Sequence, residues 1–123
     1  MSDESSLSGN STRTLRQEEV DLLRALLEGN ELGTTLSTKV RVRDLSDGGM
    51  GSIEFLSELL LERRHAKCIA EADYMDSDGV PVSIAVNVDQ HGKLFELDLW
   101  KVDFGPLRTY PSPRAIRNIR GLL

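Results

Sequence analysis

The clearest strand pattern in this 123-residue chain lies in residues 66–104, AKCIAEADYMDSDGVPVSIAVNVDQHGKLFELDLWKVDF. Valine or isoleucine stands at every second position from Val80 to Val88. Such alternation is typical of a half-buried strand, and β-branched side chains suit a pleated surface. Short turns flank this strand, and Gly79 and Gly92 supply the positive φ that tight hairpins need. The stretch therefore predicts an antiparallel meander of three strands.

The third predicted strand, from Lys93 to about Asp103, has the most unusual side-chain pattern of the chain. Alternation places Phe95, Leu97 and Leu99 on one face, and Leu94, Glu96, Asp98 and Trp100 on the other. A tryptophan beside two acids is typical of a contact surface, because exposed Trp is enriched at binding hot spots. The alternative is an ordinary solvated sheet face, with Trp100 covered by a loop or helix. The candidate interaction residues are Glu96, Asp98, Trp100 and Lys101.

An amphipathic helix is predicted from about Leu15 to Glu28. Thr14 and Gln17 fit a capping box at its start, and Gly29 is placed to end it. At about 100° per residue, the apolar side chains of this segment fall in one arc. They are Leu15, Val20, Leu22, Leu23, Leu26 and Leu27. We expect this face of the helix to pack on the sheet.

Two more strands and a short terminal helix complete the predicted fold. Strands are expected at residues 38–45 and 52–56, and residues 56–64 fit either a short helix or an irregular excursion. Ser112 and Pro113 fit the N-cap and first position of a short helix near the C-terminal end. The fold class is therefore α+β, with one N-terminal helix on an antiparallel meander sheet of about five strands.

The length indicates one domain, and the composition divides the chain into three parts. Residues 1–12 are Ser-rich and are expected to be a disordered tail. Residues 13–108 form the α+β domain, and residues 109–123 form a basic segment with the short helix. Residues 66–103 hold eight acids and three bases, whereas residues 104–123 hold four arginines and no acid. We expect the basic segment to lie across the acidic sheet, since this pairing needs no second molecule, although a separate acidic partner would also satisfy it.

Residues 47–52, DGGMGS, form a glycine-rich turn between two predicted strands. Three glycines permit unusual backbone angles, so Gly48, Gly49, Met50 and Gly51 are a candidate ligand turn. The Lys-Ser/Thr pair of a P-loop and the G-x-G-x-x-G spacing are both absent. The simpler interpretation is a turn with a bulge.

The composition argues against several classes of protein. Fifteen basic and 20 acidic residues give a net charge of −5, which is unfavourable for a general nucleic-acid binder. A single cysteine, Cys68, excludes an internal disulfide. Without a signal peptide or a run of about 18 apolar residues, we expect a reducing cytoplasmic location and no membrane contact.

The sequence assembles no catalytic set, metal site or cofactor motif. The two histidines lie far apart and lack metal-ligand spacing. Residues 76–78, DSD, open like a calcium loop, but Val80 stands at the fifth position and no glycine stands at the sixth. Glu96 and Asp98 lie about 7 Å apart along one strand face, which suits acid–base work on a sugar but occurs in any polar strand. No cofactor or metal is predicted, and an enzymatic role is disfavoured.

Several segments resemble a small bacterial family of unknown function. They are DGGMGS at 47–52, IAEAD at 69–73, DGV at 78–80 and LFELDLWKVDF at 94–104. Members look like single compact domains with an Arg-Leu-type helix, a Gly-Gly-Met-Gly turn and a Glu-Leu-Asp-x-Trp-Lys strand, and the likeness covers residues 13–108. The resemblance implies a fold and no mechanism. Small one-helix, curved-sheet domains are also similar in architecture to bacterial immunity proteins that neutralise toxins.

We therefore expect a non-enzymatic protein-interaction module, of an immunity-like kind, that binds an unidentified protein through the face of Trp100. The alternative is a small-ligand-binding domain or enzyme in which the glycine turn, Glu96 and Asp98 line one cavity. A third and weaker alternative is nucleic-acid contact through Arg41, Arg43 and the C-terminal arginines.

Overall fold

The computed structural model describes residues 11–57 and 62–122. In chain order its elements are β1 (Thr12–Thr14), α2 (Gln17–Leu26), the 3₁₀ helix η1 (Glu31–Thr35), β2 (Arg41–Asp44), β3 (Ile53–Phe55), β4 (His65–Met75), β5 (Pro81–Asp89), β6 (Leu94–Lys101) and β7 (Arg117–Gly121). The α+β class and the antiparallel sheet are confirmed, but the sheet has seven strands and not about five.

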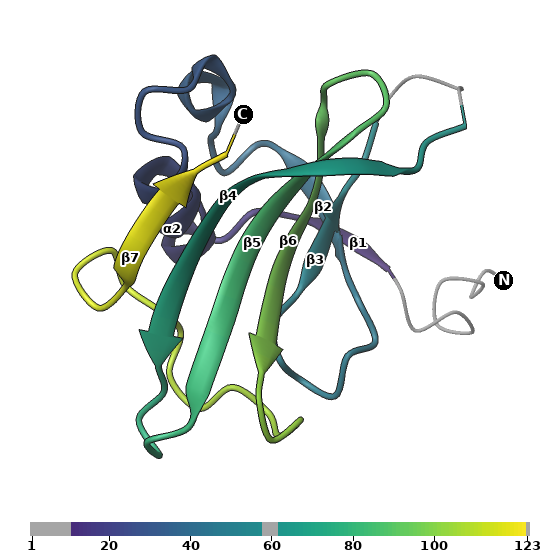
Figure 1. The fold of residues 1–123 in the computed structure, drawn as a ribbon. Coiled ribbons are helices and arrows are strands. Elements are labelled where there is room, and N and C mark those ends of the chain that lie inside the picture. Colours follow the sequence, from purple (N-terminus) through teal and green to yellow (C-terminus); the bar gives the residue numbers. More distant parts are fainter. Residues whose placement is uncertain (1–10, 58–61, 123) are drawn as a thin grey trace, which may run out of the picture.

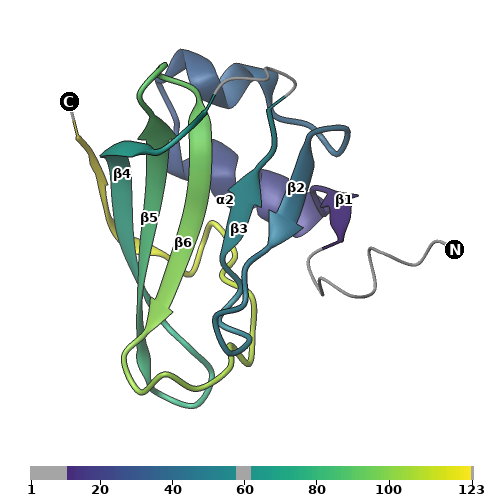
Figure 2. The same cartoon turned by 90° about the vertical axis from the view of Figure 1, so that its right-hand side faces the viewer.

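The strands form one sheet in the order β1-β2-β3-β6-β5-β4-β7, with every neighbouring pair antiparallel. The predicted meander β4-β5-β6 is its centre, and β3 joins the β6 side while β7 joins the β4 side (Figure 1). Helix α2 and η1 lie on one side of the sheet (Figure 2). The opposite side, called the outer face below, carries no helix formed by the described residues.

The register of the meander explains where the core lies. Val86 is opposite Leu97, and Ile84 is opposite Leu99, so these four side chains point to the same face. All four are buried, in one cluster with the apolar side chains of α2. The predicted turns are also present, since Gly79 has φ +80°. The alternation of apolar residues therefore defines the face that the helix covers.

A β-bulge changes the predicted alternation at the start of β6. The register shifts between Asn87 and Val88, so that Asn87 is opposite Glu96 but Val88 is opposite Leu94. Because Val88 is buried, Leu94 also turns toward the core and packs against it. The expectation that Leu94 shares the face of Glu96 is therefore wrong, since a bulge inserts one extra residue into the period of two.

Helix α2 buries the predicted apolar arc, but it begins later than predicted. Leu15, Val20, Leu22, Leu23, Leu26 and Leu27 are all buried. The predicted cap Thr14 belongs to β1, and the N-cap is Arg16, whose backbone N–H donates to Glu19 Oε1 at 2.8 Å. The guanidinium of Arg13 also binds both carboxylate oxygens of Glu19 and both of Asp44. The helix start is therefore set by a charged network that links β1, α2 and β2.

The predicted C-terminal helix is wrong, because the segment after Pro113 makes a turn and then strand β7. Pairing with β4 supplies β7 with backbone hydrogen bonds, which a helix of about two turns could not match alone. Arg120 reaches Glu71 at 3.2 Å and Asp73 at 3.6 Å. The basic segment therefore pairs with acidic residues of the same molecule, as expected, but it does so as an added edge strand and does not lie across the sheet.

Some predictions concern parts of the chain that the structure does not describe. The predicted tail at 1–12 falls mostly on residues 1–10, and the question of helix or irregular chain at 56–64 falls mostly on residues 58–61; both lie outside the described residues. Thr12, at the end of the predicted tail, belongs to β1. Within the described residues, no helix is both long and apolar enough to cross a membrane.

Candidate functional site

The outer face of β6 carries three of the four candidate interaction residues. Glu96, Asp98 and Trp100 stand opposite Asn87, Ala85 and Ser83 of β5, respectively. Residues directly opposite each other in an antiparallel pair share a face, and the intervening Leu97 and Leu99 are buried under α2. The predicted grouping of two acids and a tryptophan is therefore present on the side of the sheet that the helix does not cover.

Trp100 is exposed and contacts a second aromatic side chain. Its side chain lies edge-on to Phe104, with ring centroids 4.9 Å apart and an interplanar angle of 75°. Trp100 is 46% exposed and Phe104 is 64% exposed. Phe104 has φ +63°, an uncommon backbone conformation for a bulky residue. Phe104 therefore covers part of Trp100, and both rings remain exposed to solvent.

The two carboxylates beside Trp100 differ from the acids at the edges of the outer face. Glu96 accepts a hydrogen bond from Asn87 Nδ2 at 3.4 Å, and Asp98 accepts one from Ser52 Oγ at 3.0 Å. Neither forms an ion pair with another described residue. By contrast, Arg43 pairs with Glu54 on β3, and Arg120 pairs with the acids of β4. The centre of the face therefore keeps two negative charges that no described cation neutralises.

Lys101 does not belong to this surface, which corrects the prediction. Its side chain is 1% exposed and points to the covered face, as its odd-numbered neighbours in β6 do. The ammonium Nζ lies 2.8 Å from Asp76 Oδ2 and 2.7 Å from Asp78 Oδ2, and it donates to the carbonyl of Pro106 at 3.0 Å. Lys101 is therefore a buried structural cation, and the period of two that places Trp100 outside places Lys101 inside.

The carboxylates of the Asp-x-Asp turn, Asp76 and Asp78, both bind this ammonium. Burial alone would raise the pKa of Asp76, but hydrogen bonds from Lys101 and from the backbone N–H groups of Arg108, Ser77 and Thr109 bring it well below its usual range. The same carboxylates raise the pKa of Lys101 against the opposing effect of burial. The described residues contain no group of three or more His, Cys, Asp or Glu side chains placed to hold a metal ion.

The glycine turn is occupied by a side chain of its own. Asp47 accepts hydrogen bonds from the backbone N–H groups of Gly49 and Met50 through Oδ1, and from that of Ser52 through Oδ2. A backbone N–H group that already has a carboxylate partner is not available to a phosphate. The backbone N–H groups of the turn are thus arranged as in an anion-binding loop, but the anion that they bind is the carboxylate of Asp47.

The glycines of this turn are required by their positive φ angles and, at Gly49, also by close packing. Gly49 has φ +86°, and a Cβ there would lie 3.2 Å from Cβ of Pro106. Gly51 has φ +100°, and the backbone N–H of Leu107 donates to Gly49 O at 2.9 Å. The turn thus fastens the segment that follows β6, which includes Phe104. This indicates a structural role for Gly48, Gly49, Met50 and Gly51.

The glycine turn and the strand carboxylates do not line one cavity. The hollow beside the turn, of about 230 Å³, is lined by residues within 44–52, and neither Glu96 nor Asp98 is among them. Ser52, at the end of the turn, links it to one of these carboxylates, because its hydroxyl donates a hydrogen bond to Asp98 Oδ1 at 3.0 Å. Phe104 was not among the predicted site residues. No pattern in the residues after β6 indicates that the ring of Phe104 contacts Trp100.

Fold and surface together define a small α+β module with one covering helix and an open acidic and aromatic sheet face. The chain belongs to the family described as Domain of unknown function (DUF6984), which matches residues 12–111. The resemblance to a family of unknown function is thereby confirmed. No curated protein and no solved structure gave a significant match.

Proposed function

We propose that this protein is a non-enzymatic protein-interaction module whose contact surface is the outer face of β6. One observation carries the proposal, namely the exposed Trp100–Phe104 pair beside Glu96 and Asp98, which have no ion pair among the described residues. Exposed aromatic side chains and unpaired charges are favourable to bury only against a partner that complements both.

The chemistry of this face favours a partner with basic and apolar side chains. The protein's own arginines already neutralise acids at both edges of the face, through Arg43 on one side and Arg120 on the other. The outward residues of β5 between β4 and β6 are small, namely Ser83 and Ala85. A lysine or arginine of a partner could lie over this low floor, reach the carboxylate of Asp98 and pack its stem on Trp100.

The alternative of a ligand-binding domain or enzyme built on the glycine turn has less support. Asp47 uses the donors that a ligand would need, and the hollow beside the turn contains neither strand carboxylate. An immunity-like role, in which the acidic face would cover a basic surface of a toxin, is one form that the proposed interaction takes.

A capture experiment with a matched charge control tests this function. Tagged wild-type protein, the double variant Glu96→Lys/Trp100→Ala and the control Glu31→Lys are each incubated with native lysate. Glu31 is exposed on η1, on the other side of the sheet, so its reversal changes net charge equally without touching the face. We expect one stoichiometric protein that the wild type and the control retain and the double variant loses.

The captured protein is then purified and its affinity is measured directly. Trp100→Ala alone should weaken binding by at least about tenfold, the effect of losing a hot-spot side chain, and binding should weaken as salt is raised. Circular dichroism and thermal unfolding establish that the variants are folded. A partner that both variants retain, or the absence of any partner, would rule out this surface.

A further inference from the structure

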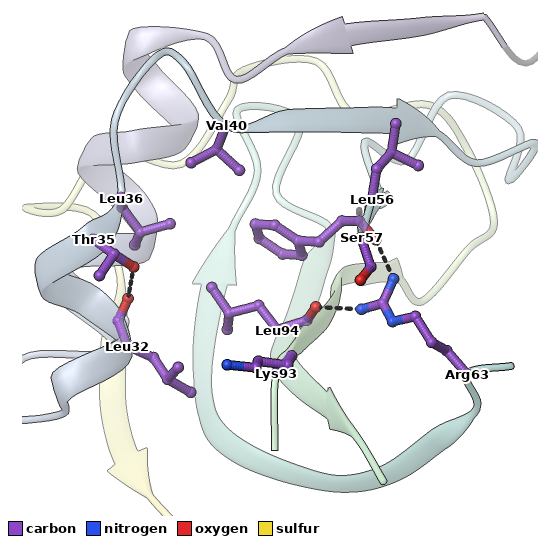
Figure 3. A pocket seen from close by; sticks show the side chains of 10 residues that line it. Leu32, Thr35, Leu36, Val40, Leu56, Ser57, Arg63, Lys93 and Leu94 are labelled. Carbon is purple, nitrogen blue, oxygen red and sulfur yellow. Dashed lines mark hydrogen bonds between the residues drawn. The ribbon is translucent and has the colours of Figure 1, made fainter. Parts of the chain in front are cut away.

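A second hollow lies at the other end of β6, away from Trp100. It is an open groove of about 490 Å³ between η1, the start of β2, the end of β3 and the start of β6 (Figure 3). The lining residues are Leu32, Thr35, Leu36, Val40, Phe55, Leu56, Ser57, Arg63, Lys93 and Leu94. Its volume falls within the range of sites that bind small molecules.

The floor and walls of this groove are apolar. Leu36 and Phe55 are buried and form part of the main core, so the groove opens onto core side chains. Leu32, Val40 and Leu94 are only half-buried and stand around them. An apolar molecule in the groove would cover this partly exposed core surface and remove it from water, which favours binding.

The charged residues that line the groove in the described part of the chain are all basic. The groove itself is lined by Arg63 and Lys93, and a neighbouring hollow of about 450 Å³ adds Lys39 and Arg41 while sharing Val40 with it. No acidic residue among the described residues 11–57 and 62–122 lines either hollow, in a chain with 20 acids and 15 bases. This is therefore a basic and apolar site in an acidic protein.

The basic residues of the groove have different roles. Arg63 is fixed by Asp89 at 2.7 Å and by the carbonyls of Phe55 and Leu94, so it holds the rim in place. Lys93 has no ion pair in the part of the chain that the structure describes, and its ammonium points into the groove (Figure 3). An ammonium without a counter-ion at the mouth of an apolar groove favours a ligand that ends in an anion.

We propose that this groove binds a single-chain amphiphile with an anionic carboxylate end, with the apolar chain over Leu36 and Phe55 and the carboxylate at Lys93. The site is independent of the proposed protein interaction, because it lies at the opposite end of β6 and prefers the opposite charge. Failure of one proposal would leave the other standing.

The test uses three probes of equal chain length, namely decanoate, decyltrimethylammonium and decanol, each below its micelle concentration. Isothermal titration calorimetry with the full chain measures affinity. We expect decanoate to bind at least about tenfold more tightly than decyltrimethylammonium, and acetate, which lacks the chain, not to bind measurably. Equal affinity for the anionic and cationic probes would overturn the proposal.

Matched variants locate the site. Lys93→Glu should weaken decanoate binding at least about tenfold, whereas Lys67→Glu, the same change at an exposed lysine of β4 outside both hollows, should leave it unchanged. Val40→Phe should fill the groove and weaken decanoate and decanol alike. If Lys93→Glu and Lys67→Glu have equal effects, or if decanoate binding survives both Lys93→Glu and Val40→Phe, the groove is not the site. Should Val40→Phe unfold, the two lysine variants still decide.

Discussion

At the scale of single residues, three aspartates organise the loops of this protein. Asp47 binds the backbone of the glycine turn, Asp76 binds the segment after β6, and Asp89 binds the N–H groups of His91 and Lys93 in the turn before β6. In each case a carboxylate satisfies backbone donors that would otherwise need water. The stability of the loops therefore depends on a few carboxylates, of which Asp76 and Asp89 are buried and Asp47 is half-buried.

The largest of these effects is expected at Asp76, whose side chain is fully buried against Lys101. Asp76→Ala should lower the free energy of unfolding by about 3–5 kcal/mol, because it leaves a buried ammonium with one carboxylate fewer. Asp78→Ala is the matched comparison, since Asp78 contacts the same Nζ but is 24% exposed. Urea denaturation measures both. A smaller loss for Asp76→Ala than for Asp78→Ala would contradict the assigned role.

Single residues were predicted well where the period of two was unbroken. Glu96, Asp98 and Trp100 share a face as the alternation required, and the same alternation should have excluded Lys101 from it. Lysine side chains are usually exposed, so the residue type of Lys101 favours an exposed position, whereas its place in the alternation favours a buried one. The acids that hold it, Asp76 and Asp78, were visible in the sequence only as a turn.

At the scale of elements, the glycine turn and the segment after β6 form one packed unit. Gly49→Ala should destabilise the protein by about 2–4 kcal/mol, since it combines a left-handed φ with a contact of 3.2 Å to Pro106. Gly79→Ala has a similar φ of +80° but nothing within 4 Å of the added Cβ. It should therefore cost only the backbone strain, about 1–2 kcal/mol. Thermal unfolding of both variants provides the comparison, and equal losses would exclude a packing role for Gly49.

Helices and strands could be predicted where the local residue pattern determines them. They could not be predicted where pairing with a distant strand determines them. The meander, its two turns and the apolar arc of α2 follow from residues close together in the sequence. Strand β7 does not, because its residues are all exposed and its partner β4 lies more than 40 residues earlier. Short segments take the conformation that tertiary pairing favours, so the weak helical pattern was overridden.

At the scale of the whole molecule, the sheet order depends on pairings that no local signal encodes. Ile53 of β3 pairs with Leu97 of β6, and this places the first three strands beside the end of the meander. Strands β2 and β3 of this half were predicted from the sequence, but β1 and the order of the strands were not. The candidate surface needs only one strand and could be predicted, whereas the groove is built from four elements and was not predicted.

The aspartate pKa values set the pH dependence of stability for the molecule. The pKa values of Asp76 and Asp89 are lowered in the folded state, where hydrogen bonds from Lys101 and Arg63, respectively, outweigh burial. The unfolded chain therefore binds more protons as the pH falls, so stability should be full above about pH 5 and decline steadily below about pH 4. The raised pKa of Lys101 acts oppositely, and its contribution should be lost above about pH 10.5.

Urea denaturation midpoints measured between pH 7 and pH 2.5 check the acid limb. Asp76→Asn provides the control, because it removes one titrating carboxyl at almost constant volume and should flatten the dependence below pH 4. A wild-type midpoint that stays constant from pH 5 to pH 3 would show that these carboxylates do not stabilise the folded state.

The ammonium of Lys101 between Asp76 and Asp78 has a consequence for how the protein meets changing surroundings. A turn that is stabilised by a bound metal ion loses the ion when the free ion concentration falls below the dissociation constant. Here the cation is the side chain of Lys101, which is part of the chain. Its contact with Asp76 and Asp78 therefore does not depend on dilution, chelators or the divalent-ion content of the medium. The turn between β4 and β5 and the segment after β6, which includes Phe104, are thus expected to keep the same geometry at any concentration of divalent ions.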